Sequence, residues 1–390
     1  MNYKVSHPTK IVECEIDLPA SKSISSRLLI IQALSKEKFK IKNLSDSDDT
    51  TSLKKALDSK ENIIDIGHAG TSFRFLTSYL SIQNGKRIIL TGSERIKERP
   101  IKELVTVLQK IGGKIDYMEN EGLPPLKING TRLEGRKVEI DGGVSSQFIT
   151  SILLIAPTLK NGIELKIKGE LVSKPYVTMT LKLMNEFGIE SSWKNNIIKM
   201  QSQDYIAKNY KVEADWSATS FWFEIAALSK NCNIKLNGLQ ENSIQGDKRS
   251  IEIFKNLGVN SEFKDGKLIL TKNQTISACK AYNLIETPDL YQPLKCMLFA
   301  RNISAEISGL KTLRNKETDR IISVENELKK LNATKIIETY KDHRMAMSFA
   351  PLCLKFGELQ INDVEVVSKS YPKFWQDLKK DGFIISPLSD

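Results

Sequence analysis

Hydrophobic positions along the chain gather into six segments that are apolar on nearly every side. Two examples are residues 148–156 and 345–352. A helix that is apolar all round must be buried. Each segment follows a short polar start whose Ser, Thr or Asp side chains can cap a helix. The six starts are residues 21–23, 70–72, 144–147, 215–217, 288–289 and 342–344.

A second pattern alternates with these segments. In this pattern a helix ends at a Gly or Asn, and a strand follows. The glycine or asparagine can adopt the left-handed backbone conformation that ends many helices. The first four stops lie about 70–76 residues apart, a spacing typical of a supersecondary repeat. The stops are Gly112, Gly188, Gly258, Asn332 and Gly382.

Together the two patterns predict an α/β protein of six repeated units in two domains, because six buried helices are too many for one core. Units 1–3 are expected in residues 20–214. Units 4–6 are expected in residues 215–390, joined by residues 1–19, although the strand at 11–18 could pair with either half. In each half the buried helices would start in the same direction, and two facing halves would pool six helix N-termini in one anion-binding cleft.

The first unit is predicted to be truncated. Between Asp49 and Gly67 there is room for a helix at 51–57 and a strand at 63–66, and little more. The other units have more strand before their helix start.

Composition points to anionic partners. The 390-residue chain has a net charge of +11, with 27% charged residues. The lysines are spread through amphipathic segments rather than gathered in a basic tail, which favours small anions over nucleic acid. A non-catalytic module that binds nucleic acid remains the alternative from another class. No stretch of 18 apolar residues and no secretory signal is present, so neither membrane association nor export is expected.

Five widely spaced cysteines and three histidines complete the composition. The cysteines form no C-x-x-C pair, which is typical of reduced thiols in a cytoplasmic protein. Because no cluster of ligands is apparent, neither a structural nor a catalytic metal is expected.

The first polar start is the most informative stretch. Ser21, Lys22, Ser23 and Arg27 combine a helix N-terminus with two cations, which favours an anion site. Taken alone, a capped helix with solvated cations is the simpler interpretation. The recurrence of similar starts along the chain favours the anion site.

Several motifs in order then resemble the 5-enolpyruvylshikimate-3-phosphate synthase family of enolpyruvyl transferases. The resemblance runs from about Leu18 to Trp375. Its motifs are LPASKS (18–23), DSDD (46–49), AGT (69–71), LTG (90–92), KERPI (97–101), VSSQF (144–148), SKPY (173–176), QGD (245–247), KETDR (316–320), DHRMAM (342–347) and SK (368–369). The fold that it implies is a two-domain inside-out α/β barrel, each domain built from three βαβαββ-type units.

The resemblance implies transfer of the enolpyruvyl group of phosphoenolpyruvate to the 5-hydroxyl of shikimate 3-phosphate, with release of phosphate. Shikimate 3-phosphate would be bound by Lys22, Ser23, Arg27, Ser145, Ser146, Gln147, Ser173, Tyr176, Asp289 and Lys316. Phosphoenolpyruvate would be bound by Lys22, Gly70, Thr71, Arg99, Gln147, Arg320, Arg344 and Lys369. Arginine suits this task because its planar fork matches carboxylate and phosphate.

The resemblance also implies which groups move protons. Asp289 matches the acceptor for the hydroxyl proton, and Glu317 matches a residue that moves the methyl proton, with Lys22 as a further catalytic residue. From the residues alone, a capping aspartate and an i,i+3 ion pair explain Asp289 and Glu317 equally well. His343 could assist proton transfer or position substrate.

By the same resemblance we expect a cytoplasmic, cofactor-free monomer that closes on its substrates. The sequence departs from the family pattern at His68, Phe75 and Thr312, which bears on phosphoenolpyruvate affinity. A related transferase that uses UDP-N-acetylglucosamine is the nearest rival. It is disfavoured because the KERP loop lacks the cysteine typical of that enzyme.

Overall fold

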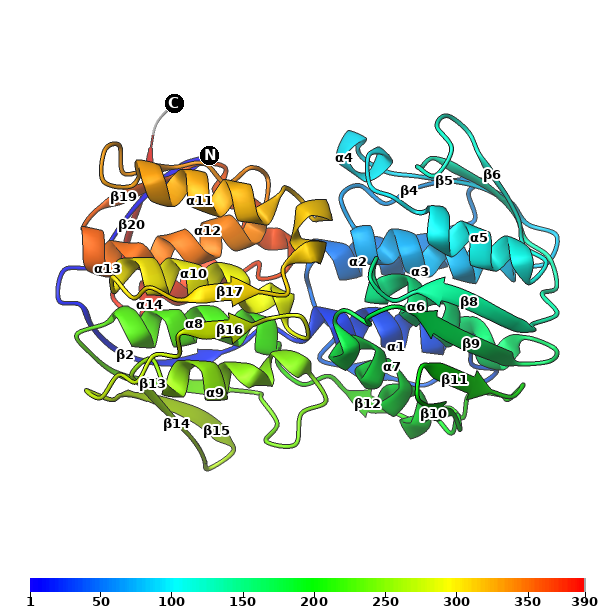
Figure 1. The fold of residues 1–390 in the computed structure, drawn as a ribbon, viewed down its shortest axis with the longest axis horizontal. Coiled ribbons are helices and arrows are strands. Elements are labelled where there is room, and N and C mark those ends of the chain that lie inside the picture. The colour runs from blue at the N-terminus through cyan, green and yellow to red at the C-terminus, as the bar shows by residue number, and fades with distance from the viewer. Residues whose placement is uncertain (389–390) are drawn as a thin grey trace. The chain divides into compact units, whose positions relative to one another are not determined.

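The protein is described by a computed structural model over residues 1–388. The chain divides into two compact units. The discontinuous unit comprises Met1–Ser21 and the chain from Glu213 onward, and the inserted unit comprises Lys22–Val212. Figure 1 shows both, with the inserted unit running from blue to green.

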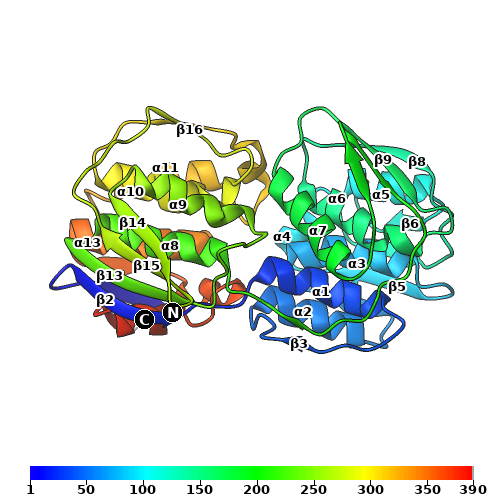
Figure 2. The ribbon, with the colours of Figure 1, turned by 90° about the horizontal axis from the view of Figure 1, so that it is seen from below.

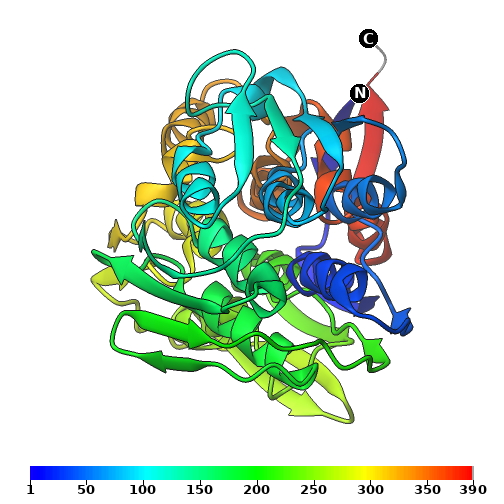
Figure 3. The same cartoon turned by 90° about the vertical axis from the view of Figure 1, so that its right-hand side faces the viewer.

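The inserted unit has two four-stranded sheets and one pair of short strands. The first sheet has the order β4-β5-β7-β6, with strands Ile63–Asp65, Arg87–Thr91, Leu126–Asn129 and Lys114–Tyr117. The second has the order β10-β11-β9-β8, with strands Ser192–Lys194, Ile197–Met200, Ile163–Lys168 and Lys137–Asp141. The short parallel pair is β3 (Ile41–Lys42) with β12 (Tyr210–Lys211). Figure 3 shows the two larger sheets in cyan and green.

Three central helices of this unit begin at the predicted polar starts. They are α1 (Lys22–Leu34), α3 (Gly70–Ser81) and α6 (Ser146–Ile155), and they pack against one another. Most of their residues are buried, but the helices are not apolar on every side as expected, because α1 and α3 each bury serines and an arginine. The remaining helices are α2 (Asp48–Asp58), α4 (Glu94–Lys97), α5 (Lys102–Lys110), α7 (Lys174–Glu186) and the 3-10 turn η1 (Ala156–Thr158).

The discontinuous unit repeats this construction. One sheet has the order β14-β15-β13-β2, with strands Val259–Lys264, Lys267–Lys272, Asn231–Asn237 and Ile11–Asp17. A second has the order β18-β19-β1-β20, with strands Ile336–Ile337, Leu359–Ile361, Asn2–Ser6 and Ile384–Leu388. The short parallel pair is β16 (Ala281–Asn283) with β17 (Glu306–Ser308). In Figure 2 the sheet of β2, β13, β14 and β15 lies along the outer side of the unit, against α8.

The central helices here are α8 (Trp216–Leu228), α10 (Tyr291–Ala300) and α12 (His343–Phe349), which also pack against one another. They begin at the last three predicted starts, with the turn η3 (Pro288–Leu290) leading into α10. The other helices are α9 (Ser250–Lys255), α11 (Arg320–Lys330), α13 (Cys353–Phe356) and α14 (Phe374–Lys380), and the 3-10 turns are η2 (Gly246–Arg249), η4 (Lys311–Asn315), η5 (Ala350–Leu352) and η6 (Val364–Lys369).

Parallel strands on either side of a buried helix recur in both units. The crossovers β4–α3–β5 and β8–α6–β9 join parallel strands of the inserted unit. The crossovers β16–α10–β17 and β18–α12–β19 do the same in the discontinuous unit. Such connections bring each helix start to the end of a strand, which is where ligands bind in α/β proteins.

The structure settles one open alternative and corrects other local expectations. The strand at 11–18, which could have paired with either half, is β2, and it pairs in parallel with β13 of the discontinuous unit. A second short module, around β16 and β17, was not foreseen. The expectation of longer strands outside the first unit was wrong there and also at β18, which has only two residues. Asn332 does not adopt the left-handed conformation expected of a helix stop, whereas Lys335 does, with φ 51°.

Each sheet is open, with a different strand at each edge. The core of the discontinuous unit is rich in aromatic residues from α8, where Trp216, Phe221, Trp222 and Phe223 are all at most 1% exposed. Within residues 1–388, we find no helix that is both long enough and apolar enough to cross a membrane.

Candidate active site

Arg27 is the most deeply buried cation among the predicted site residues of the inserted unit. It is 3% exposed. Its guanidinium donates to the backbone oxygens of Ser23 (2.7 Å) and Tyr176 (3.2 Å), and to the hydroxyls of Thr180 (2.8 Å) and Thr150 (3.4 Å). Burial lowers the pKa of Arg27 to about 10, against a smaller opposing effect of Tyr176. Because all its hydrogen-bond partners within the described chain are uncharged, this buried cation favours an anion nearby.

Lys22 stands at the first residue of α1. Its Nζ lies 3.0 Å from Oδ2 of Asp49 in α2, and the Asp49 side chain is only 4% exposed. A partly buried ion pair holds the ammonium in place at the start of the helix, where the dipole favours anions. Asp49 lies in one of the recognised motifs but was not predicted as a site residue.

The start of α3 carries two arginines beside a glycine. Arg99, which is 7% exposed, lies against the Cα of Gly70 so closely that a Cβ added there would collide with its guanidinium. Arg74 lies one turn into α3, is 4% exposed and donates to the backbone oxygen of Gly70 at 3.0 Å. Two buried guanidinium groups at a helix N-terminus make a strongly electropositive site. Sequence analysis predicted Gly70 and Arg99 but missed Arg74.

Polar side chains at the starts of neighbouring helices also meet in this unit. The amide nitrogen of Gln147 donates to the hydroxyl of Thr71 at 3.0 Å, which links α6 to α3. The Ser145 hydroxyl caps α6 by accepting from the backbone nitrogen of Gln147. Ser146 is the first residue of α6 and is 8% exposed.

Ser173 has an unusual backbone for its residue type. It precedes α7 with φ 55° and ψ 39°, and its side chain does not cap the helix. A serine with a left-handed backbone conformation is uncommon, and the conformation costs free energy. Strained residues of this kind are often found at functional sites, which agrees with the predicted ligand role of Ser173. Tyr176 follows in the first turn of α7, and its backbone oxygen accepts from Arg27.

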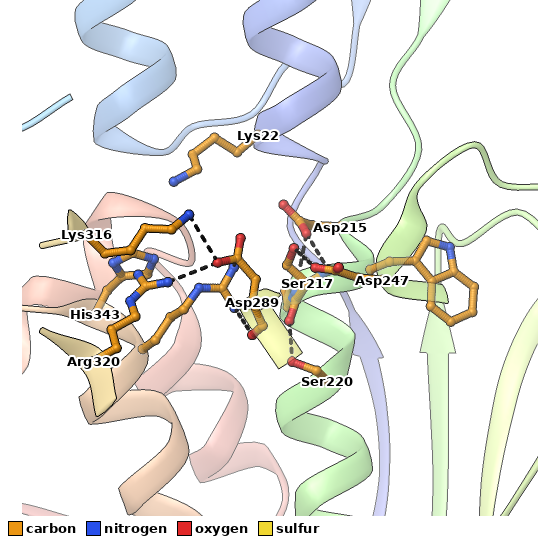
Figure 4. Close-up of polar contacts among 12 residues, drawn as sticks. Lys22, Asp215, Ser217, Ser220, Asp247, Asp289, Lys316, Arg320 and His343 are labelled. Carbon is orange, nitrogen blue, oxygen red and sulfur yellow. Dashed lines mark hydrogen bonds and ion pairs between the residues drawn. The ribbon is translucent and has the colours of Figure 1, made fainter. Parts of the chain in front are cut away.

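In the discontinuous unit, Arg320 is the centre of an ion-pair network. Its side chain is 2% exposed. It binds Asp342 through two nitrogens (2.7 and 3.3 Å), Asp289 at 3.0 Å and Glu317 at 2.9 Å. Figure 4 shows the guanidinium pointing toward Asp289. The three carboxylates stabilise the cation, so the pKa of Arg320 is raised although burial opposes this.

The other predicted cations of this unit extend the network. Lys369 lies 2.9 Å from Glu317, and Lys316 lies 3.5 Å from Asp289. Arg344 lies 3.3 Å from Asp289 Oδ2 and also donates to the Asp289 backbone oxygen at 3.0 Å. The four predicted cations and two predicted acids of this unit therefore belong to one connected group.

Asp289 and His343 differ in their surroundings. Burial opposes ionisation of Asp289, but the nearby cations Arg344, Lys316 and Arg320 outweigh it and hold its pKa well below its usual range. Asp289 therefore pairs with cations instead of capping a helix, which was the simpler interpretation of its sequence. The ring of His343 is 2% exposed, and its Nδ1 lies 3.6 Å from Asp342 Oδ1.

The balance of charge in this group favours anions. Lys316, Arg320, Arg344 and Lys369 contribute +4, and Asp289, Glu317 and Asp342 contribute −3, which leaves +1. An anionic substrate can replace the carboxylates as the binding partner of these cations. Across residues 1–388, no group of three or more His, Cys, Asp or Glu side chains is arranged to hold a metal ion.

Asp342 was missed by sequence analysis although it lies in a recognised motif. Its side chain is fully buried, it caps α12 by accepting from the backbone nitrogen of Arg344, and it also binds Arg320. Its position immediately before two predicted residues was a signal that could have been used.

Comparison with known proteins identifies the family. The family model described as EPSP synthase (3-phosphoshikimate 1-carboxyvinyltransferase) matches residues 6–59 and 51–378. A 3-phosphoshikimate 1-carboxyvinyltransferase of Bacteroides fragilis strain YCH46 is 44% identical over 405 residues, which cover 98% of both chains. The protein of the same name from Psychromonas ingrahamii is 34% identical and covers 97% of this chain and 99% of its own.

A solved structure agrees in fold. The EPSP synthase of Acinetobacter baumannii aligns with a TM-score of 0.78 at 20% sequence identity, covering 99% of this chain and all of the other. With its fold, its full-length relatives and its cation-rich helix starts in agreement, the chain belongs to the EPSP synthase (3-phosphoshikimate 1-carboxyvinyltransferase) family.

Proposed function

We propose how the residues of this chain carry out the reaction of its family. The chain is a transferase that moves the enolpyruvyl group of phosphoenolpyruvate to the 5-hydroxyl of shikimate 3-phosphate and releases phosphate. The observation that best supports residue assignments is the network around Arg320, because it gathers every site residue predicted in the discontinuous unit except His343.

The phosphate of shikimate 3-phosphate is proposed to bind near Arg27. Among the described residues, the buried guanidinium has only uncharged hydrogen-bond partners, and it lies beside the starts of α1 and α7, where backbone N–H groups favour an anion. The proposed ligands for this substrate are Lys22, Ser23, Arg27, Ser145, Ser146, Gln147, Ser173, Tyr176, Asp289 and Lys316. The left-handed backbone of Ser173 supports its place among them, since such conformations concentrate at ligand sites.

Phosphoenolpyruvate is proposed to use the arginines. Arg99 beside Gly70 supplies one bidentate partner, and Arg320 and Arg344 supply others. The full proposed set is Lys22, Gly70, Thr71, Arg99, Gln147, Arg320, Arg344 and Lys369. The hydrogen bond from Gln147 to Thr71 supports placing both in the same local site.

Asp289 is the proposed acceptor of the 5-hydroxyl proton. Its low pKa keeps it ionised at neutral pH, so it can accept a proton, but it also makes Asp289 a weak base in the unliganded protein. As the substrate anions bind Arg344 and Lys316, the hold of these cations on Asp289 weakens and its basicity rises. The base is thus strengthened only when substrate is present.

Glu317 is the proposed carrier of the methyl proton. In the first step, the hydroxyl oxygen adds to the central carbon of phosphoenolpyruvate, and the methylene carbon of phosphoenolpyruvate gains a proton and becomes a methyl group. In the second step, phosphate leaves while the methyl group gives a proton back to Glu317. Glu317 is held by Lys369 and Arg320 at 2.9 Å each, which fixes its position. His343 and Lys22 complete the proposed catalytic group, with His343 positioned by its closeness to Asp342.

The arrangement of each unit, the domain boundaries, the cellular location and the oligomeric state are also proposals. We propose an inside-out arrangement in each unit, with sheets outside the buried helices, and domain boundaries at residues 19–20 and 214–215. Five cysteines without disulfides in the described residues support a cytoplasmic location. We further propose a monomer that needs no cofactor and binds neither nucleic acid nor membrane.

The direct test measures phosphate release from phosphoenolpyruvate with and without shikimate 3-phosphate, with the product identified by mass. Lys22→Ala and Asp289→Ala should each reduce turnover by at least about 100-fold while the circular dichroism spectrum is unchanged. Lys36→Ala is the matched control, since this exposed lysine pairs with Asp204 at the surface. If phosphate release needs UDP-N-acetylglucosamine instead of shikimate 3-phosphate, the proposed acceptor is wrong.

A further inference from the structure

Gln245 is a buried glutamine that belongs to neither the proposed catalytic group nor the proposed substrate ligands. It begins the QGD motif, stands immediately before η2 and is 7% exposed. Its Oε1 accepts the hydroxyl of Ser21 at 2.9 Å and the backbone N–H of Trp216 at 3.2 Å, and its Nε2 donates to the backbone oxygen of Ala214 at 2.8 Å. One side chain therefore joins two segments that are far apart in the sequence.

The backbone partners determine the orientation of this amide. A backbone N–H can only donate and a backbone carbonyl can only accept, so Oε1 faces Trp216 and Nε2 faces Ala214. At Oε1 the Ser21 hydroxyl can then only donate its proton. Because Ser21 is fully buried, removing this acceptor carries the cost of breaking a buried hydrogen bond.

The two joined segments are the places where the chain leaves and re-enters the discontinuous unit. It leaves after Ser21 and re-enters at Glu213. Ala20 and Ala214 form an antiparallel bridge, and the backbone nitrogen of Ser21 donates to the backbone oxygen of Glu213 at 2.8 Å. Gln245 binds one residue of each segment, so it stabilises the pair at this crossing.

The backbone of Gln245 is connected to the same crossing by a second route. Its N–H donates to the hydroxyl oxygen of Ser243 at 3.1 Å, and that hydroxyl donates to Oε1 of Glu213 at 2.7 Å. With the bond from Ser21 to Glu213, these contacts close a ring of hydrogen bonds within the discontinuous unit. A closed network restricts Ser21 more strongly than a single bond would.

The start of α8 is also occupied by this arrangement. The N–H of Trp216 donates to Gln245, and the N–H groups of Ser217 and Ala218 donate to Oδ1 of Asp215 at 2.7 and 3.3 Å. The first three N–H groups of α8 thus have acceptors within the protein. This helix start therefore has little to offer an anion, and it serves instead as a fixed point for Gln245.

We propose that Gln245 is a positioning residue for Lys22. Lys22 follows Ser21 directly and is the first residue of α1, so a fixed Ser21 determines where the Lys22 side chain begins. The other end of this side chain is held separately, by Asp49 at 3.0 Å. The inference rests on the proposed role of Lys22 in binding shikimate 3-phosphate.

The test measures the dissociation constant for shikimate 3-phosphate by titration calorimetry, which needs no turnover. Gln245→Leu keeps a side chain of similar size and removes its three hydrogen bonds. Binding should weaken by about tenfold, close to the contribution of one hydrogen bond to a charged group. Gln376→Leu, the same substitution at an exposed residue of α14, is the matched control and should bind like the unaltered protein.

Repeating the substitution in Lys22→Ala separates positioning from a general defect. If Gln245 acts through Lys22, then Gln245→Leu should change the dissociation constant by less than about twofold once Lys22 is absent. A purely structural role would weaken binding by the same factor in both backgrounds, or would lower only the number of binding sites per protein. Either of these results would overturn the proposal.

Ser21→Ala is a milder variant that keeps the proposal testable if Gln245→Leu does not fold. It removes the bond from Ser21 and leaves Gln245 bound to Ala214 and Trp216. Binding should weaken about as much as in Gln245→Leu, and the double variant should be no weaker than either single variant. An unchanged dissociation constant in Ser21→Ala would also overturn the proposal. Absence of shikimate 3-phosphate binding by the unaltered protein would instead refute the proposed function.

Discussion

Replacing Arg320 by methionine tests which ion pairs stabilise the network of the discontinuous unit. Arg320→Met removes four hydrogen bonds to three carboxylates. Asp289 would keep Arg344 and Lys316, and Glu317 would keep Lys369. The remaining carboxylate, Asp342, is fully buried and loses its two close guanidinium contacts. The damage should therefore centre on Asp342.

The expected size follows from the cost of leaving a buried charge unpaired, which is about 3–5 kcal/mol. With a urea m-value of about 2 kcal/mol/M, a loss of about 4 kcal/mol lowers the unfolding midpoint by about 2 M. Arg314→Met is the matched control, because Arg314 is 59% exposed and pairs with Asp319 at 3.2 Å. An exposed pair of this kind contributes at most about 1 kcal/mol.

The double variant Arg320→Met/Asp342→Asn separates the lost pair from a general packing defect. Asparagine can still accept from the backbone nitrogen of Arg344 and cap α12, but it carries no charge to leave unpaired. Urea unfolding followed by circular dichroism should show the double variant more stable than Arg320→Met alone. Equal stability of the two, or a loss below about 1 kcal/mol in the single variant, would refute this account of the network.

Two further predictions concern the other unit and the core. Gly70→Ala should raise the KM for phosphoenolpyruvate by about tenfold or more, because the new Cβ displaces Arg99, and steady-state kinetics would check it. Burial raises the pKa of Glu224 well above its usual range, so folding takes up a proton and the free energy of unfolding falls as pH rises from acid to neutral. Glu224→Gln should be more stable than the unaltered protein at pH 8, with a difference that shrinks toward pH 4 in urea unfolding. An equal difference at both pH values would contradict the assigned burial of this charge.

The starts of the central helices were predictable because two local signals coincide there. A run such as residues 148–156 is apolar at every helical position, and a polar cap such as Ser145 precedes it. Neither signal depends on distant parts of the chain. The glycines at the helix ends were predicted correctly for the same reason. Gly112 and Gly188 adopt positive φ, and this need does not depend on where the helix packs.

Strand length was harder to predict, because partners far along the chain decide it. Strand β16 spans only Ala281–Asn283, and its partner is β17, which follows after helix α10. Strand β1 lies within the first six residues and was not foreseen, although it joins β19 and β20. Its pairing involves residues more than 350 positions away.

The missed site residues share one physical property, which is that they act through partners. Asp49 holds Lys22, and Asp342 holds Arg320. Motif matching finds the groups that meet a substrate, but the groups that hold them are recognised only from distances. Arg74 is an exception, because its position four residues after Gly70 places both on one face of a helix start.

The acids of the discontinuous unit explain how a site for anions can fold without its ligands. Arg320 and Arg344 lie almost wholly within the protein, where unpaired cations would be costly. Asp289, Glu317 and Asp342 neutralise most of this charge and fix the guanidinium groups before substrate arrives. In the proposed reaction, an incoming anion exchanges with a carboxylate, and Asp289, the carboxylate that it displaces, becomes the stronger base. Under this proposal, the stability of the unliganded site and the timing of proton transfer depend on the same ion pairs.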